Sequence, residues 1–235
     1  MKKKETVSLL FDFLHRSFMH HALWFSEVRH QIGDEKAYAL INEVWNKSLA
    51  IQTERFSKIM GWNINEALES LPEAKLDDIR DAMAVNWLAT DGIWFQAVEF
   101  SRGMNDAKRC NDSCWAQFSP FEAKSIKSVL GLKQKPGLEG LKQALELRLY
   151  AFINEQEITD EKEDSFVFRM KKCRVQAARN RKGLADYPCK SGGLVEYTTF
   201  AEAIDPEIKT ECMACPPDQH PDDWYCAWRF YIGSE

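Results

Sequence analysis

The sequence predicts an α+β fold that is mostly helical and carries a small antiparallel sheet in its C-terminal third. Through roughly the first 150 residues, apolar side chains recur at spacings of three and four, the pattern of amphipathic helices. Only after residue 165 do apolar and polar residues alternate, as they do in strands with one buried face. The chain has 235 residues, of which 45% are hydrophobic, so it can bury a sizeable core.

An internal repeat predicts that the N-terminal half contains a duplicated helical hairpin. At a constant offset of 70 residues, six residues of the first segment recur in the second: Trp24, Phe25, Val28, Gly33, Ala37 and Trp45 match Trp94, Phe95, Val98, Gly103, Ala107 and Trp115. Both segments, at about 20–45 and 90–115, read as a helix, a glycine break and a second helix. Coincidence in a tryptophan-rich helical protein is the alternative.

Further helices are predicted from periodicity and end signals over 35–59, 105–116 and 137–154. Another should begin at Ser119-Pro120, because serine caps a helix, proline suits the first turn, and Glu122 completes a capping box.

The C-terminal part is predicted to combine three strands with two helices. The strands are expected over 166–170, 210–213 and 224–232, and the helices over 174–182 and 194–204. Residues 155–164 are polar and read as a connection. We therefore expect a helical part over 1–160 and a cysteine-rich α+β part over 161–235, packed together as one unit.

Charge and composition indicate which cellular compartment and which classes of partner to expect. The formal charge of −5 does not favour nucleic acid, and no apolar stretch approaches the ~20 residues that span a membrane. The basic N-terminus precedes an apolar run broken by Asp12 and Arg16, so it reads as the start of an amphipathic helix and not as a secretory signal. Seven cysteines, an odd number without an export signal, favour a cytoplasmic location.

Four of these cysteines form a candidate metal site. Cys212 and Cys215 have the C-x2-C spacing of a metal knuckle. Cys189 lies in a glycine-containing loop and Cys173 ends the first predicted strand, so both could approach the same metal ion. Four thiolates would suit zinc or an iron–sulfur cluster, and His220 could replace one of them. Alternatively, these cysteines are small buried hydrophobes. We assign Cys226, Cys110 and Cys114 to packing.

Two oppositely charged segments suggest an anion site or mutual neutralisation. Residues 171–190 carry seven Lys and Arg against one Asp, and residues 202–223 carry seven acidic residues against one Lys. Arg174 and Arg179 are the candidates for binding a small anionic ligand, since arginine pairs with carboxylates in bidentate geometry. Neutralisation between the two segments is the favoured alternative.

Polar residues on apolar helix faces give a candidate catalytic group. His21 and Asp91 occupy equivalent positions of the repeat, and Glu99 lies two turns beyond Asp91. If the two hairpins pack about a pseudo-twofold axis, these side chains could meet in a tryptophan-lined cavity and supply a general base. A structural His–Asp pair is the favoured alternative.

Several stretches together resemble a bacterial family of uncharacterised cytosolic proteins. They are 24–28, 91–99, 173–179, 187–190 and 212–218, and the similarity covers nearly the whole chain. The family is itself distantly similar to L-2-amino-thiazoline-4-carboxylate hydrolase-like proteins. That resemblance implies a small cyclic amino-acid-like substrate attacked by water.

Three functions follow as hypotheses. The first is a metal-containing, small-molecule-binding cytoplasmic protein, with the metal on the four cysteines and the ligand on Arg174 and Arg179. The second is a hydrolase that uses His21, Asp91 and Glu99, or a metal-bound water. The third is a structural zinc site without a ligand. The sequence leaves the oligomeric state open.

Overall fold

The computed structural model describes residues 2–181, 183 and 186–233, and the chain separates into two compact units. The first unit spans Met1–Leu71 and the second spans Pro72–Glu235. The division that composition suggests at residue 160 falls inside the second unit, so the cysteine-rich part shares its unit with the second helical hairpin.

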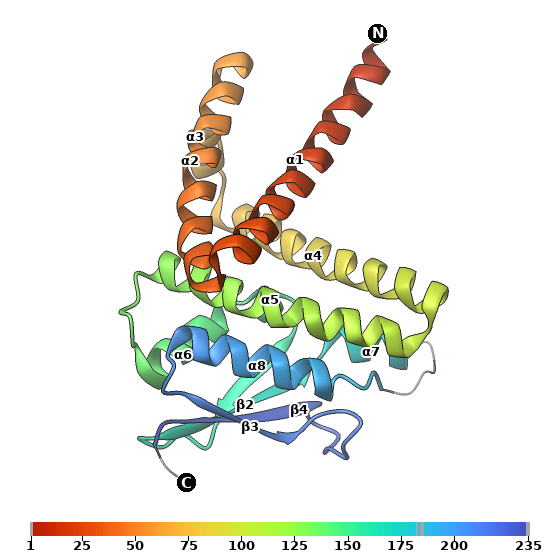
Figure 1. Ribbon diagram of the computed structural model, residues 1–235, viewed down its shortest axis with the longest axis vertical. Helices are drawn as coiled ribbons and strands as arrows, with labels where there is room; N and C mark the ends of the chain where they lie inside the picture. Colours follow the sequence, from red (N-terminus) through yellow and green to blue (C-terminus); the bar gives the residue numbers. More distant parts are fainter. Residues whose placement is uncertain (1, 182, 184–185, 234–235) are drawn as a thin grey trace. The chain divides into compact units, whose positions relative to one another are not determined.

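The first unit is a helical hairpin followed by a short helix. Helix α1 (Lys3–Ile32) and helix α2 (Asp34–Met60) join at Gly33 and diverge from that turn, and α3 (Ile64–Glu69) follows (Figure 1). Asn63 caps α3 by accepting hydrogen bonds from the amides of Asn65 and Glu66. Among the described residues of this unit, only Ala37 and Tyr38 are buried hydrophobic side chains. Its stability therefore depends little on a core of its own.

The second unit begins with a hairpin that confirms the predicted duplication. Helices α4 (Glu73–Arg102) and α5 (Met104–Leu130) have 30 and 27 residues, the same lengths as α1 and α2. The joining glycines have nearly the same conformation, with φ of 92° at Gly33 and 93° at Gly103. A positive φ disfavours residues with a Cβ, which explains why glycine occurs at both turns. Both hairpins end in a left-handed glycine, Gly61 and Gly131.

The rest of the second unit combines short helices with a four-stranded sheet. After α6 (Gly137–Glu146) and the 3-10 turn η1 (Leu149–Phe152) come β1 (Glu155–Thr159) and β2 (Ser165–Lys172). Helices α7 (Arg174–Asn180) and α8 (Lys190–Ile204) precede β3 (Lys209–Ala214) and β4 (Cys226–Tyr231). The strand order is β1-β2-β4-β3 and every pair is antiparallel, which confirms the predicted α+β class.

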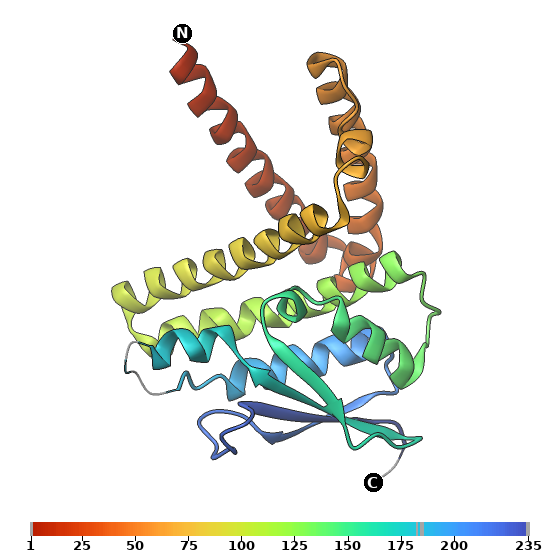
Figure 2. The same cartoon turned by 180° about the vertical axis from the view of Figure 1, so that it is seen from behind.

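The helices of the second unit stack in layers on one face of this sheet. Helix α8 lies on the sheet, α5 packs against α8, and α4 packs against α5 (Figures 1 and 2). The core between sheet and helices is built from large side chains such as Phe166, Phe200, Trp228 and Phe230. Gly193 allows α8 to approach closely, because a Cβ there would lie 2.7 Å from the Trp228 ring. The first turn of α8 is thereby held against the sheet.

Several ends of helices and strands differ from those that the local sequence predicted. The helix start predicted at Ser119 is wrong, since α5 continues through Pro120 to Leu130. Ser119 and Glu122 are buried there, so burial of this helix face outweighs the cost of one missing hydrogen bond. The helix expected over 137–154 ends at Glu146. Residues 155–159, expected as a connection, form β1, because pairing with β2 satisfies their backbone despite a polar sequence.

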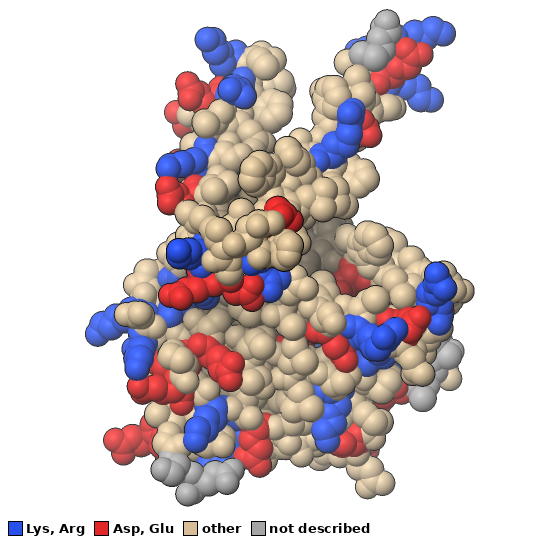
Figure 3. All heavy atoms as spheres, viewed as in Figure 1, with Lys and Arg blue, Asp and Glu red and all other residues tan. Residues whose placement is uncertain are grey.

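Two surface properties of the described residues bear on membranes and on charge. Within the described residues, none of the helices combines the length and apolar character that a bilayer crossing requires. On the face shown in Figure 3, Lys and Arg side chains are interspersed with Asp and Glu and do not gather into one basic patch.

Candidate functional site

A cavity of about 640 Å³ lies inside the second unit. Its walls come from α4 and α5 on one side, from α7 and α8 on another, and from β2 and β4 at the base. Aromatic and apolar residues, among them Phe95, Trp115, Tyr150 and Trp228, make up much of the lining. A mostly apolar hollow with a few convergent polar groups is the usual form of a small-molecule site.

Three carboxyl groups line this cavity. Asp91 and Glu99 come from α4, as the sequence predicted for one helix face, and Glu196 comes from α8. Burial raises the pKa of Asp91. Burial also raises the pKa of Glu196, to about 7, helped by the nearby charges of Glu122 and Asp91 and opposed by Arg148. A carboxyl group that titrates near neutral pH can both accept and donate a proton under physiological conditions.

Glu196 belongs to a buried charge cluster that the sequence did not reveal. The Arg148 guanidinium donates a hydrogen bond from Nε to Glu122 at 2.8 Å, and its Nη1 lies 2.7 Å from Oε1 of Glu196. Burial opposes the charge of Arg148, but the two carboxyl groups outweigh it, so the pKa of Arg148 is raised. Glu122 also accepts a hydrogen bond from the amide of Leu149. Its role is therefore that of an ion-pair partner and not of a capping residue.

Aromatic rings surround the same guanidinium. The Arg148 Cζ lies 4.6 Å from the ring centre of Phe200 and 5.4 Å from that of Tyr197, with Trp115 and Tyr150 slightly farther away. Ring faces attract a cation most strongly where water is excluded. The cluster fixes Glu196 in place at the cavity wall.

The two predicted anion-binding arginines both line the cavity. Arg174 and Arg179 extend from α7. The Arg174 guanidinium has neither a hydrogen-bond acceptor nor a carboxylate partner within the described part of the chain, and the Arg179 Cζ lies 6.0 Å from the ring centre of Tyr187. The favoured alternative, neutralisation by the acidic segment 202–223, accounts for Lys190, which forms an ion pair with Asp218 at 2.8 Å. Arg174 gives this part of the α7 wall a positive character.

Several buried polar atoms of the lining have no hydrogen-bond partner among the described residues. They are Asn154 Nδ2, Tyr187 Oη and Trp228 Nε1. Buried polar atoms are normally satisfied, because an unpaired one costs about 1–3 kcal/mol. Three such atoms therefore border one cavity, where their hydrogen-bonding capacity is unused by the described residues.

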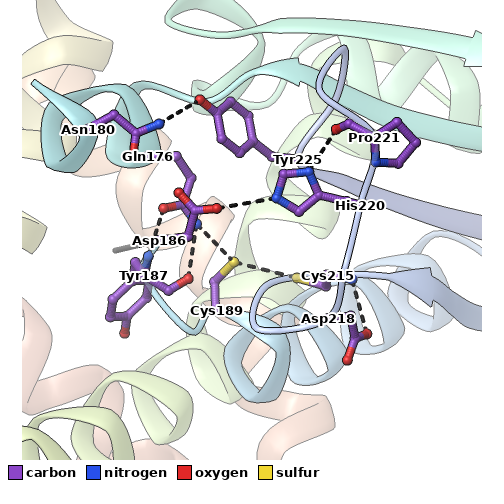
Figure 4. A network of polar contacts seen from close by, with 10 residues as sticks. All are labelled: Gln176, Asn180, Asp186, Tyr187, Cys189, Cys215, Asp218, His220, Pro221 and Tyr225. Atoms are coloured by element: carbon purple, nitrogen blue, oxygen red, sulfur yellow. Dashed lines mark hydrogen bonds and ion pairs between the residues drawn. The ribbon is translucent and has the colours of Figure 1, made fainter. Parts of the chain in front are cut away.

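Two thiols lie face to face at the cavity wall (Figure 4). The Sγ atoms of Cys189 and Cys215 are 3.4 Å apart, and Gln176 donates a hydrogen bond from Nε2 to Cys189 Sγ at 3.6 Å. Cys189 is the N-cap residue of α8. The hydrogen bond from Cys215 lowers the pKa of Cys189, and the same bond raises that of Cys215. Either thiol can be the donor in this contact.

The predicted four-cysteine metal site is only partly assembled. Cys173, Cys189 and Cys215 line the cavity, as does Cys226, while Cys212 lies in the edge strand β3. Within the described residues, no group of three or more His, Cys, Asp or Glu could hold a metal ion. Zinc or an iron–sulfur cluster on Cys173, Cys189, Cys212 and Cys215 stays a prediction.

The two histidines considered as site residues have other neighbours. The His220 ring lies 3.3 Å from Asp186 through Nε2 and 2.8 Å from the carbonyl of Pro221 through Nδ1. Although burial opposes it, these two contacts raise the pKa of His220. His21 belongs to the first unit, where its ring meets the edge of Trp45 at 6.1 Å between centres. Its pairing with Asp91 stays a prediction.

Comparison with known proteins places the chain in a family without an assigned activity. Residues 73–232 match the model of a family of unknown function, DUF6125, and the chain belongs to that family. The matched region begins at the first residue of α4 and contains the whole cavity lining. No curated protein matches the sequence, and no solved structure matches the fold.

Proposed function

We propose that the second unit binds a small amphoteric molecule, one that carries both a carboxylate and an amino group, inside the cavity between α4, α7 and α8. The observation that carries this proposal is the separation of charge across the cavity. Carboxyl groups lie on α4 and α8, and arginines lie on α7. The anion site suggested by Arg174 and Arg179 then forms one half of the binding surface.

Hydrogen-bonding capacity supports the same ligand class. The indole Nε1 of Trp228 and the amide Nδ2 of Asn154 are donors without partners in the described structure, so they suit the oxygens of a carboxylate or carbonyl group. Asp91 lines the cavity without a cationic partner among the described side chains, and so suits an ammonium group. The aromatic lining suits an apolar body between the two groups.

Matched ligands test this proposal by calorimetry. We expect L-tryptophan to bind more tightly than 3-indolepropionate, which lacks the amine, and tryptamine, which lacks the carboxylate. R174Q should weaken binding of the two carboxylates and spare tryptamine, whereas D91N should weaken binding of the two amines and spare 3-indolepropionate. R109Q is a matched control, because Arg109 is an exposed arginine that does not line the cavity. Equal binding of all three compounds, or equal losses in both variants, would contradict the proposal.

A hydrolase is the second candidate, and the pKa of Glu196 favours it. A carboxyl group with a pKa of about 7 beside a cavity can accept a proton from an attacking water. Asp91 and Glu99 of the predicted catalytic group border the same cavity. Chromatographic loss of L-2-amino-thiazoline-4-carboxylate on incubation, abolished in E196Q, is the expected result. Turnover that persists in E196Q would remove Glu196 from the reaction.

A further inference from the structure

We propose that Cys189 and Cys215 form a peroxide-reactive dithiol site that closes reversibly into a disulfide at the wall of the cavity. The inference is independent of the ligand proposed above, because it concerns the chain's own sulfur atoms. It rests on their spacing, on the contacts that hold their two segments together, and on their access to the cavity.

Only a small movement of the two sulfur atoms is needed to bring them to the length of a disulfide bond. The sulfur atoms are 3.4 Å apart, and a disulfide bond is about 2.05 Å long, so they must approach by roughly 1.4 Å. Rotation about the Cα–Cβ bonds moves sulfur atoms over such distances without displacing the backbone. The segments that carry the thiols need not be brought together, because they already lie side by side (Figure 4).

Residues next to each cysteine fasten the two segments to each other. The amide of Lys190 donates a hydrogen bond to the carbonyl of Pro216 at 2.9 Å. The Lys190 ammonium pairs with both carboxylate oxygens of Asp218, at 2.8 and 3.0 Å. Asp218 in turn accepts a hydrogen bond from the amide of Cys215 at 3.2 Å. These contacts link the residue after Cys189 to the turn around Cys215, so the two sulfur atoms stay opposite each other.

The surroundings assign different roles to the two cysteines. Cys189 is half-buried, begins α8 and receives a hydrogen bond from Gln176, so its sulfur is the better placed to carry negative charge. Cys215 is only 1% exposed. Cys189 is thus the sulfur that an oxidant in the cavity reaches first, and Cys215 is the partner that resolves the product.

The reaction consumes one hydroperoxide and gives one disulfide. The Cys189 thiolate attacks the terminal oxygen of the hydroperoxide, the O–O bond breaks, and the alkoxide leaves as an alcohol after taking up a proton. The Cys189 sulfenic acid is then attacked by the Cys215 sulfur, so that the S–S bond forms and the S–O bond breaks. The departing hydroxide combines with the Cys215 proton as water. Two thiols are oxidised by two electrons, the peroxide is reduced, and an external dithiol reverses the change.

Peptide mapping of the full-length protein tests the proposal. Reduced protein is treated with equimolar hydrogen peroxide, its remaining thiols are alkylated, and its peptides are identified by mass spectrometry. We expect one link between Cys189 and Cys215 that dithiothreitol removes and that is lost in C189S and in C215S. In C215S, dimedone should trap a sulfenic acid at Cys189. The variant C110S/C114S is the matched control, because it replaces two exposed cysteines and leaves Cys189 and Cys215 in place. It should retain the link between Cys189 and Cys215.

Three results would overturn the proposal. One is oxidation confined to Cys110 and Cys114 while Cys189 and Cys215 stay reduced. The second is a link from Cys215 to Cys226, which also contacts it. The third is tightly bound metal in anaerobically purified protein that prevents oxidation until a chelator is added, since that would assign these thiols to a metal site. Circular dichroism of each serine variant establishes that it is folded.

Discussion

Replacing Glu196 by Gln should remove a pH dependence of stability that the buried carboxyl group imposes on the second unit. Glutamine has nearly the same size and still can lie beside Arg148, but it does not ionise. In the folded protein the pKa of Glu196 is raised from 4.5 to about 7, chiefly by burial. The folded state therefore binds the proton more tightly than the unfolded state does.

The sign and size of the effect follow from this difference in pKa. Protonated Glu196 contributes stability that is fully present below pH ~4.5 and is lost as the pH rises through about 7. A shift of 2.5 units, from 4.5 to about 7, corresponds to roughly 3 kcal/mol at about 1.4 kcal/mol per unit. The free energy of unfolding of the wild type should thus fall relative to that of E196Q by about 3 kcal/mol between pH ~5 and ~8.

Urea denaturation followed by tryptophan fluorescence measures this difference. Both proteins are unfolded at a series of pH values between 5 and 8, at constant ionic strength and with reductant present. The same comparison in a D91N background should give a smaller fall, because the charge of Asp91 contributes to the raised pKa of Glu196. A difference that stays constant with pH, or that grows with rising pH, would refute the assignment of Glu196 as a buried group titrating near neutrality.

Two further substitutions test the packing around the cavity. R148M should lower the free energy of unfolding, measured in urea, by about 3–5 kcal/mol, because it leaves the carboxyl groups of Glu122 and Glu196 buried without a cation. Adding E122Q to the same chain should restore part of this loss. G193A should cost about 1–3 kcal/mol, measured in the same way, since the added Cβ meets Trp228. Its control is G92A, where a Cβ meets nothing within 4 Å and helix propensity should raise stability by up to ~1 kcal/mol. Equal effects of the two alanine variants would contradict the close approach of α8.

Periodicity and the repeat predicted most of the fold because they report on short-range geometry. The 70-residue offset located both glycine turns, alternation located β2 and β4, and the third predicted strand, over 210–213, corresponds to β3. The fourth strand, β1, is polar and at the sheet edge, where pairing with β2 decides its conformation and the side chains carry little signal. Pro120 misled for the opposite reason, since a local helix-start signal was outweighed by packing of the whole α5 face.

The site was harder to predict because it depends on contacts between residues far apart in the chain. Asp91 and Glu99 were singled out because charged residues on an apolar face are rare enough to stand out, and both line the cavity. Glu196 carries no comparable signal, and its importance comes from Arg148, which lies 48 residues earlier in the sequence. The C-x2-C spacing drew attention to Cys212, whereas the structure pairs Cys215 with Cys189. Spacing along the chain identifies possible ligands, and only the fold decides which sulfur atoms meet.

Equivalent positions of the two similar hairpins have different surroundings in the structure. Position 21 of the first hairpin corresponds to position 91 of the second, and Trp45 corresponds to Trp115. In the first unit, His21 makes a T-shaped ring contact with Trp45. In the second unit, Asp91 and Trp115 both line a cavity, because α7, α8 and the sheet close over the inner face of the hairpin. The hairpin therefore supplies a polar group beside an aromatic wall, and the elements after it supply the opposing charges on which the proposed ligand site depends.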